Sequence, residues 1–391
     1  MWVAIESEAK GLVIISEYPS RHRPDVAQVG VVILNWNGWP DTLECLDSIL
    51  LSNHRSFDLI LVDNGSSDQS LDKIRKWASK NYGEDDFRSY DSDYKDNMSD
   101  RDGTLKLERG RLYDGYCAED NRCKISREGR FFLLQSSENL GFAGGCNLGI
   151  RHAMEVGNDY IWLLNNDTTV ERNALERLVG FLATNPEVDG VTGQIRYSRD
   201  RSVIWNCGGR LTWYGTRRYY YANSPASTAP QDGWKSASFV TGCAILLRTA
   251  LLREVGVLSD KFFFGEEDIE FCLRLKRHKR QLACVFNSII YHKVSASTEG
   301  SGRKGEEGKI YIHLLNRFIN MRTYYPLFVW HIWRIGVLSY IVPMMLSRYH
   351  LKLLDCWKMV SMLIRNSSSK TSVTREDFFS ALGSFTPREH E

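Results

Sequence analysis

The sequence predicts an α/β fold in which a mainly parallel sheet carries a ligand cleft along one edge. Three apolar runs have the length and the β-branched or aromatic content of buried strands, at residues 29–34, 57–62 and 160–164. The first two alternate with helical patterns, as they do in parallel sheets. Each run ends in polar residues, and ligands of open α/β sheets bind at the carboxyl ends of the strands.

The remaining elements continue this alternation. Leu43, Leu46 and Ile49 recur at helical spacing, which predicts a helix over 41–51. A second helix is expected from an N-cap at Ser67 or Asp68 to about Lys80. Further strands are expected at 131–135, 191–197, 239–248 and 282–291. Further helices are expected after Gly141, at 171–184 and after the acidic residues 266–268. Residues 81–130 are polar and lack this periodicity, so we expect a solvated insertion with room for one hairpin.

The composition bounds the class of protein and its compartment. The chain has 391 residues, of which 43% are hydrophobic and 25% charged, and its net charge of +2 gives no reason to expect a nucleic-acid partner. Nine cysteines occur without CxxC pairs, which indicates reduced thiols in the cytoplasm, although Cys117 and Cys123 could pair. Glu6, Glu8 and Lys10 interrupt the region where a signal peptide would need an apolar core.

The run that starts at Tyr160 stops abruptly at Asn165, Asn166 and Asp167. A carboxylate beside amide oxygens at a strand end suits a hard divalent cation that carries phosphate oxygens. The alternative is structural, because Asn and Asp are good N-caps and a helical pattern follows.

A glycine-rich stretch precedes this run. Gly141, Gly144 and Gly145 would let the backbone approach a phosphate or nucleotide at the start of a helix. The spacing is not that of a dinucleotide fingerprint, and small residues also permit close packing of a helix on a sheet.

An acidic cluster follows the aromatic run of residues 262–264. Its members are Glu266, Glu267, Asp268 and Glu270. Acidic residues favour the start of a helix for dipole reasons alone, but crowded carboxylates also raise the pKa of at least one of them, which suits a general base. The last expected strand delivers His292, a candidate metal ligand at a strand end. Between these motifs lie Trp205, Trp213 and Tyr219–Tyr221, which either stack on sugar rings or form an aromatic hairpin packed on the core.

These motifs together resemble the inverting family 2 glycosyltransferases of GT-A fold, and within them the rhamnosyltransferase-like enzymes. The resemblance rests on VVILNWNG, VDNGSSD, ENLGFAGGCNLGI, LLNNDTTV, TGCAILLR, FFFGEEDIEFCLR and YHKVSAS, which occur in this order over about residues 29–325. It implies a Rossmann-like nucleotide-diphospho-sugar transferase sandwich. It also implies a role for each matched residue.

By this resemblance, Asp268 is the catalytic base, with Glu267 as second choice. The nucleotide-binding residues are Asn35, Asp63, Asn64, Asn139, Gly141, Gly144 and Asn166. The metal and diphosphate ligands are Asn165, Asp167 and His292, and the sugar or acceptor contacts are Trp205, Trp213 and Glu266. The first position of the family's DxD motif is here Asn165, so the expected cation, Mn²⁺ or Mg²⁺, has one charged ligand fewer and a metal-independent variant stays open.

The C-terminal region is expected to be helical over 310–365, followed by a polar tail over 366–391. The run from Leu327 is long and apolar, but Arg334 near its middle would cost about 2.5–3.5 kcal/mol in a membrane span. We therefore expect helices that lie on the cytoplasmic leaflet, with packing on the catalytic domain or a homodimer interface as the alternative. The loop over 294–309 is expected to close over the donor, with Arg303 or Lys304 reaching the diphosphate, unless it is a plain linker.

The sequence thus predicts an N-terminal extension over 1–27, a catalytic domain over 28–309 and the helical region. The expected activity is inverting transfer from a dTDP-rhamnose-like or UDP-sugar donor to a glycan or lipid-linked acceptor in cell-envelope or exopolysaccharide synthesis. The competing hypothesis is a catalytically inactive nucleotide-sugar or carbohydrate-binding module of the same fold. It is disfavoured because both Asp167 and Asp268 are present.

Overall fold

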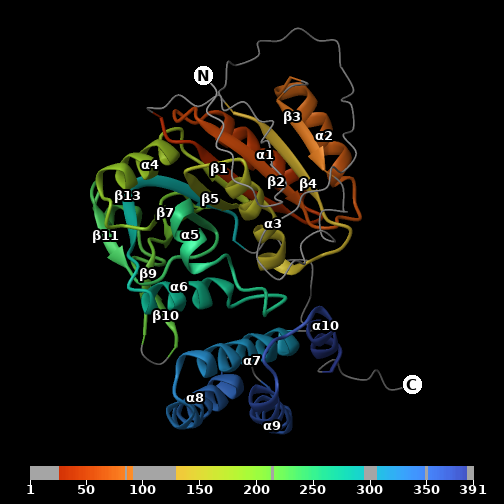
Figure 1. Ribbon diagram of the computed structural model, residues 1–391. Coiled ribbons are helices and arrows are strands. Elements are labelled where there is room, and N and C mark those ends of the chain that lie inside the picture. The colour runs from red at the N-terminus through yellow and green to blue at the C-terminus, as the bar shows by residue number, and fades with distance from the viewer. Residues whose placement is uncertain are drawn as a thin grey trace, which may run out of the picture.

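The protein is built around one large mixed sheet, with helices on both faces and a separate layer of helices at the C-terminal end (Figure 1). The computed structural model describes residues 26–83, 86–90, 129–212, 215–294, 306–347 and 351–384. Residues 1–25 of the predicted N-terminal extension lie outside these ranges, as do the pair Cys117 and Cys123, Trp213, and the loop residues Arg303 and Lys304.

The first half of the sheet is parallel. Its strands are β1 (Val29–Asn35), β2 (Phe57–Asp63), β4 (Phe131–Gln135) and β5 (Tyr160–Asn165), joined in the order β4-β2-β1-β5. Their carboxyl ends therefore lie at one edge, as predicted. The short strand β3 (Phe87–Tyr90) pairs with β4 in parallel. The start of the expected insertion thus extends the sheet, and residues 91–128, which include most of that insertion, lie outside the described ranges.

The second half is mixed. Strand β12 (Ala244–Arg248) pairs antiparallel with β5, and beyond it lie β7 (Gly190–Tyr197), β13 (Leu282–His292) and β11 (Trp234–Ala237). Strand β6 (Thr168–Val170) pairs antiparallel with the end of β13, and β8 (Ile204–Asn206) pairs with β7. Strands β9 (Gly209–Leu211) and β10 (Arg217–Tyr219) form a separate hairpin, as the aromatic segment predicted.

The strands are buried on both faces because helices cover each side. Val31 and Ile33 face one core with α1 (Trp39–Leu50), α2 (Ser70–Asn81) and α4 (Ala174–Thr184). Val32, between them, faces the other core with α3 (Gly141–Glu155), α5 (Thr249–Val255) and α6 (Glu267–Arg277). This alternation is the two-residue period of a strand, which explains why nearly continuous apolar runs predicted the sheet correctly.

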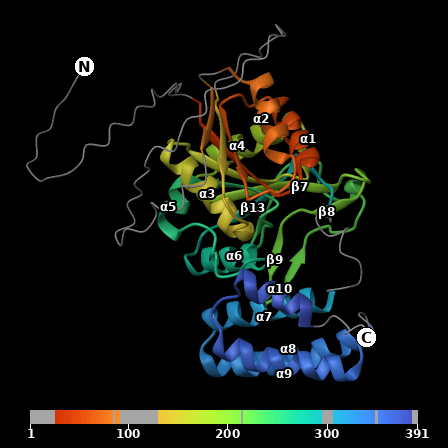
Figure 2. The ribbon, with the colours of Figure 1, turned by 90° about the vertical axis from the view of Figure 1, so that its right-hand side faces the viewer.

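The C-terminal layer consists of α7 (Glu306–Tyr324), α8 (Leu327–Ser347), α9 (Leu353–Ser369) and α10 (Arg375–Ser384). It has its own apolar core, in which Phe318, Trp330 and Met359 are fully or almost fully buried. Figures 1 and 2 show α7 next to the catalytic half of the molecule, with α8 and α9 farther away.

Several predicted elements were wrong in their limits. The strand expected over 239–248 is continuous only from Ala244, with an isolated bridge between Phe239 and Gly209 before it. The helix expected from residue 171 begins at Ala174. Helix α2 begins at Ser70, after both proposed N-caps. The polar tail expected over 366–391 is also wrong, because α9 continues to Ser369 and α10 follows.

Candidate functional site

The carboxyl ends of β1 and β2 hold a buried polar network around Asp63. Its carboxylate accepts hydrogen bonds from Asn35 Nδ2 at 2.7 Å, from Ser66 Oγ at 2.6 Å and from the Ser66 backbone amide at 3.1 Å. Asn35 and Asp63 are almost completely buried. Because charged acceptors form the stronger hydrogen bonds, this network fixes the carboxylate at the sheet edge.

A second network joins the end of β2 to the start of α3. Asn64 Nδ2 donates to Asn139 Oδ1 and to the carbonyl oxygen of Gly141, both at 3.1 Å, while the Leu140 amide donates to Asn64 Oδ1 at 3.0 Å. Gly141 has φ +75°, and a Cβ there would lie 2.2 Å from the carbonyl oxygen of Phe263. This position needs glycine, and it ties the glycine-rich turn to the segment that leads into the acidic cluster.

Asn166 belongs to the first network. Its Nδ2 donates to Thr42 Oγ1 at 3.0 Å, and Thr42 Oγ1 in turn donates to Asn35 Oδ1 at 2.8 Å. The predicted role as a helix N-cap is wrong for residues 165–167, because β6 follows them and Asn173 precedes α4. At Gly144, which the sequence also singled out, a Cβ would lie 2.9 Å from the Leu140 Cβ.

Asp167 and His292 meet through the pairing of β6 with β13. Thr168 lies opposite His292 in the register, and the Lys293 amide donates to the Asp167 carbonyl at 3.0 Å. This brings Asp167 Oδ1 to 3.0 Å from His292 Nε2. The angle at this contact does not make a hydrogen bond, and within the described ranges Asp167 Oδ1 and His292 Nδ1 are buried without a hydrogen-bond partner.

A buried carboxylate oxygen without a hydrogen-bond partner, such as Asp167 Oδ1, suits a cation. A carboxylate and an imidazole are ordinary ligands of a divalent metal, and Asn165 precedes them at the end of β5. In the part of the chain that the structure describes, no group of three or more His, Cys, Asp or Glu side chains is arranged to hold a metal. A cation here would therefore need oxygen ligands from the amide, from water or from a bound phosphate.

The acidic cluster lies at the start of α6. Burial, followed by the negative charge of Asp268, raises the pKa of Glu267 to about 8. Burial also raises the pKa of Asp268, but the Arg217 guanidinium, 3.6 Å away at Nη1, opposes this rise. At neutral pH one proton therefore resides on Glu267, while Asp268 beside Arg217 is the carboxylate better able to stay ionised.

Glu266 is held by the C-terminal helices. Its backbone is left-handed, with φ 73°, and its buried carboxylate forms two contacts with the Arg317 guanidinium of α7, one of them 2.6 Å long. His313 Nδ1 lies 3.5 Å from the same carboxylate, and Asn316 Nδ2 donates to the Phe264 carbonyl at 2.9 Å. Burial alone would raise the pKa of Glu266, but the charges of Arg317 and then His313 lower it. The predicted contact of Glu266 with sugar or acceptor stays untested.

The aromatic segment connects the two halves of the site. Trp205 packs on His292 with ring centroids 4.6 Å apart and on Tyr219 at 6.2 Å. Arg217 lies over the Tyr219 ring at 5.6 Å and reaches Asp268. The hairpin that carries Arg217 and Tyr219 therefore links the acidic cluster, through Trp205, to the Asp167–His292 pair. A sugar bound between them would lie next to Trp205, although sugar stacking stays a prediction.

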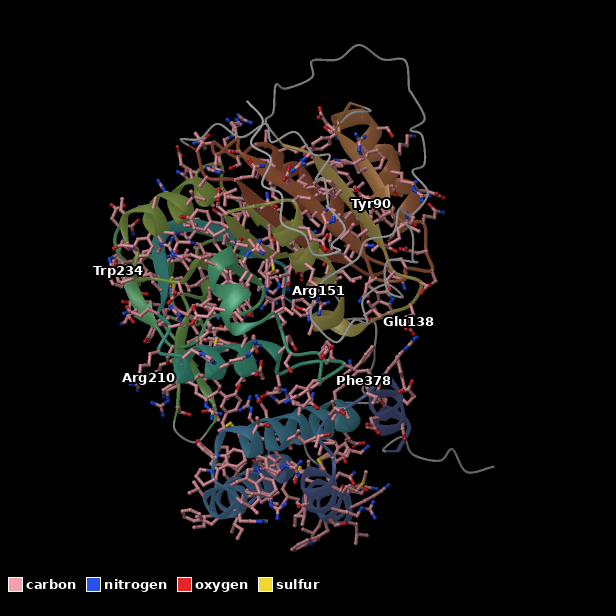
Figure 3. All side chains as sticks on the ribbon, in the orientation of Figure 1. Tyr90, Glu138, Arg151, Arg210, Trp234 and Phe378 are labelled. Atoms are coloured by element: carbon pink, nitrogen blue, oxygen red, sulfur yellow. The ribbon has the colours of Figure 1, made fainter. Side chains whose placement is uncertain are left out.

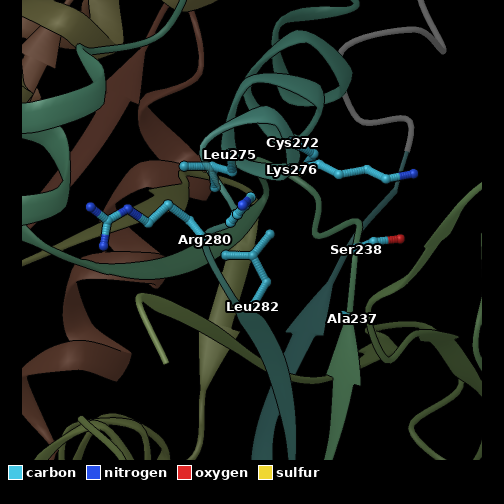
Figure 4. Close-up of a pocket in the computed structure, with 8 residues that line it drawn as sticks. Ala237, Ser238, Cys272, Leu275, Lys276, Arg280 and Leu282 are labelled. Carbon is cyan, nitrogen blue, oxygen red and sulfur yellow. The ribbon is translucent and has the colours of Figure 1, made fainter. Parts of the chain in front are cut away.

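Two further contacts tie α10 to this region. Phe378 packs on Phe263 and Phe264 with ring centroids 5.5 and 5.6 Å apart, and Arg375 lies 3.8 Å from Glu138 in the glycine-rich turn. Figure 3 shows Phe378 on α10 and Glu138 facing it from the catalytic half. A small pocket of about 200 Å³ lies elsewhere, at the opposite end of α6 (Figure 4). Its lining residues are Ala237, Ser238, Cys272, Leu275, Lys276, Lys279, Arg280 and Leu282.

Sequence reasoning missed four residues of the site: Thr42, Ser66, Arg217 and Arg317. Ser66 lies within the polar residues after β2 and could have been singled out there. Thr42, Arg217 and Arg317 reach their partners only through the tertiary fold.

Comparisons with known proteins indicate the family of this chain. Residues 128–317 match the model described as glycosyltransferase like family 2, and residues 30–96 match glycosyl transferase family 2. The chain is 23% identical over 193 residues to the low-salt glycan biosynthesis hexosyltransferase Agl10 of Haloferax volcanii. That match covers 48% of this chain and 58% of the relative, so the chain spans little more than half of the curated protein.

A solved structure supports the fold. GalNAc-T7, crystallised with UDP, GalNAc and Mn²⁺, superposes with a TM-score of 0.51 at 13% identity, over 76% of this chain and 48% of its own. The mannosyltransferase PcManGT of Pyrobaculum calidifontis, in complex with GDP-Man and Mn²⁺, has a TM-score of 0.49 at 14% identity, over 94% and 90% of the two chains. The predicted GT-A fold with C-terminal helices is confirmed.

Proposed function

Because this chain is a family 2 glycosyltransferase, we propose that it transfers a hexose from a nucleotide-diphospho-sugar to a hydroxyl group, with inversion at the anomeric carbon. The observation that carries the proposal is the chain of contacts that links two charged groups. Trp205 packs on His292 of the Asp167–His292 pair and on Tyr219, and Arg217, over the Tyr219 ring, reaches Asp268. This is the arrangement needed to hold a diphosphate and to deprotonate an acceptor across a bound sugar.

The nucleotide would lie along the ends of β1 and β2. Asp63, which Asn35 and Ser66 hold in place, is suited to accept hydrogen bonds from the base, and the turn at Asn139 and Gly141 gives close backbone approach. Asp167 and His292, with the amide of Asn165, would hold Mn²⁺ or Mg²⁺. Such a cation supplies positive charge to the departing diphosphate.

Asp268 is the proposed base. Its carboxylate takes the proton of the acceptor hydroxyl, whose oxygen attacks the anomeric carbon from the face opposite the diphosphate. The carbon–oxygen bond to the nucleoside diphosphate breaks, and its electron pair leaves with the diphosphate. Glu267 is less suited, because a pKa of about 8 leaves it largely protonated at neutral pH.

The finer predictions belong to the same proposal. They are a dTDP-rhamnose-like or UDP-sugar donor, a rhamnosyltransferase-like subgroup, and a glycan or lipid-linked acceptor used in cell-envelope or exopolysaccharide synthesis. Agl10 is a hexosyltransferase of glycan biosynthesis, which supports the general class of reaction. The proposed location is the cytoplasm, at the cytoplasmic face of a membrane.

The first test is a thermal-shift screen of UDP, dTDP, GDP, CDP and ADP, each with and without Mn²⁺. A ligand that binds only the folded state at 100 times its Kd stabilises it by about 2.7 kcal/mol, so a selective shift identifies the donor's base. We expect Asp167→Asn to weaken the increment due to Mn²⁺. No shift with any nucleotide would favour the inactive binding module or a degenerate enzyme.

The second test separates binding from chemistry. Asp268→Asn is nearly isosteric, so it should keep the nucleotide shift and lose sugar transfer. Asp260→Asn, at an exposed position eight residues upstream, is the matched control and should keep both. Transfer that survives in Asp268→Asn would remove Asp268 from the role of base.

A further inference from the structure

Helix α8 carries apolar side chains on two opposite sides. Trp330, Trp333 and Ile341 face the core of the helical layer, whereas Phe328, Ile332 and Ile335 are 68–70% exposed. At 100° per residue, these two groups of side chains lie about half a turn apart around the helix. A helix that is apolar on both sides is not explained by packing against one partner.

Helix α9 extends the same exposed surface. Its core side carries Met359 and Leu363, while Leu354, Trp357 and Ile364 are at least 42% exposed. Both helices lie on the side of the molecule farthest from the sheet (Figures 1 and 2). Six large apolar side chains on one layer exceed the scattered single residues of an ordinary surface. We call the exposed side of these two helices the α8–α9 face.

The charge of α8 and α9 favours an anionic membrane as the partner of the α8–α9 face. The described residues from 327 to 369 include four basic side chains, Arg334, Lys352, Lys358 and Arg365, against one acidic side chain, Asp355. Lys358 and Arg365 are exposed and lie two turns apart on the outer side of α9. Long basic side chains beside apolar ones are suited to the headgroup region of an anionic membrane, where the stems stay in apolar surroundings and the charges reach the phosphates.

The environment of Arg334 decides between lying on a membrane and spanning it. Among the described residues, α8 is the one helix that is long and apolar enough to cross a bilayer. Its central Arg334, however, donates to Ser368 Oγ of α9 at 2.8 Å and lies 4.4 Å from the Trp330 ring centroid. Trp330 Nε1 in turn donates to the Phe318 carbonyl of α7 at 2.9 Å. A spanning α8 would break these contacts, whereas an α8 lying in the interface keeps them.

We propose that the α8–α9 face docks on the surface of a membrane that contains anionic phospholipids. The six exposed apolar side chains enter the headgroup boundary, and Lys358 and Arg365 contact the lipid phosphates. This deepens the expected membrane contact by naming the face, its orientation and the lipid charge. It does not depend on the transfer reaction.

The orientation has a consequence that rests on the proposed function. Helix α7 lies between the docked face and the acidic cluster, because its Arg317 contacts Glu266. Packed helix axes are about 8–10 Å apart, so two helix layers place Asp268 on the order of 20 Å above the membrane surface. An acceptor anchored in the same membrane would reach this height if it consisted of a lipid diphosphate and a few sugars. A free glycan acceptor would not require the enzyme to dock on a membrane.

The test is vesicle flotation of the full chain. We expect it to float with vesicles of phosphatidylglycerol and phosphatidylcholine, and far less with phosphatidylcholine alone. The double variant Ile332→Asp/Ile335→Asp should lower partitioning by at least about tenfold, since two exposed apolar groups are lost to the membrane. Leu51→Asp is the matched control, because Leu51 is also exposed (48%) but lies beside α1. Its binding should equal that of the wild type.

A second variant tests the charge, and folding is checked in each. Lys358→Glu/Arg365→Glu should abolish the preference for phosphatidylglycerol while leaving the melting temperature and the nucleotide shift unchanged. Wild-type protein that ignores both kinds of vesicle overturns the proposal. So does a wild-type dimer that Ile332→Asp/Ile335→Asp dissociates without any vesicle binding, because a second copy would then cover the face. Failure of sugar transfer with intact flotation would count against the enzyme assignment only.

Discussion

The contact between Arg317 and Glu266 gives a stability prediction with a defined dependence on pH. The Glu266 carboxylate is completely buried and forms two contacts with the guanidinium. Arg317→Met removes the positive charge but keeps much of the apolar stem. Breaking a buried pair in this way typically costs about 3–5 kcal/mol, because one charge stays buried without its partner.

Protonation of Glu266 limits the destabilisation caused by Arg317→Met, because a neutral carboxyl group needs no counter-charge. Its ordinary pKa is 4.5, so taking up a proton at pH 7 costs about 3.4 kcal/mol at 1.36 kcal/mol per pH unit. At pH 5 the same proton costs only about 0.7 kcal/mol. In the wild type the pKa of Glu266 is lower in the folded protein than in the unfolded chain. The stabilisation by the Arg317–Glu266 pair is therefore fully present above the pKa of Glu266 in the unfolded chain. It is lost as the pH falls through the pKa of Glu266 in the folded protein.

We therefore expect Arg317→Met to be less stable than the wild type by about 3 kcal/mol at pH 7, and by about 1 kcal/mol at pH 5. Urea unfolding followed by tryptophan fluorescence at both pH values measures the difference. Glu266→Gln in the Arg317→Met background should recover part of the loss at pH 7. Arg210→Met, at an exposed position, is the control. A loss that is the same at both pH values would show that Glu266 is not the buried charge responsible.

Two further predictions concern the site. Arg217→Met should move the acid limb of the kcat/KM profile to higher pH. Removing the guanidinium raises the pKa of Asp268, so this carboxyl group is protonated at a pH where it is ionised in the wild type. Arg218→Met, at the exposed neighbouring position, should leave the profile unchanged. Gly141→Ala should destabilise the fold by more than about 1–3 kcal/mol and weaken the nucleotide thermal shift, since both its left-handed backbone and its close neighbour exclude a Cβ. Gly180→Ala in α4, where a Cβ meets nothing within 4 Å, should instead stabilise the protein by about 0.5–1 kcal/mol. Melting temperatures and nucleotide shifts of both variants check this pair.

The sheet could be predicted from sequence because each strand's signal is local. The apolar runs at β1, β2 and β5 end in polar residues, and parallel pairing then collects those residues at one edge. This reasoning brought Asp167 and His292 together correctly, although they are 125 residues apart. It did not predict β6, whose three residues are too few to show a period.

What could not be predicted depends on contacts between distant segments. Helix α10 has a polar composition, and its position is set by Phe378 packing on Phe263, which no local pattern reveals. No local pattern in the sequence marks Arg217 or Arg317, and only the fold places them beside acidic side chains. The apolar residues before Ala244 are buried outside the strand, with one isolated bridge from Phe239 to Gly209, so their hydrophobicity alone overstated the length of β12.

The position of Arg317 also determines where this chain can be divided. The match to the family model ends at residue 317, in the middle of α7. A fragment cut at that point would keep the guanidinium but lose Phe318 and Ile319, which lie in the apolar core of the helical layer. A fragment cut before α7 would also lose Arg317, the guanidinium that pairs with the Glu266 carboxylate. The sheet-containing half and the C-terminal helices are therefore expected to fold, and to be purified, as one unit.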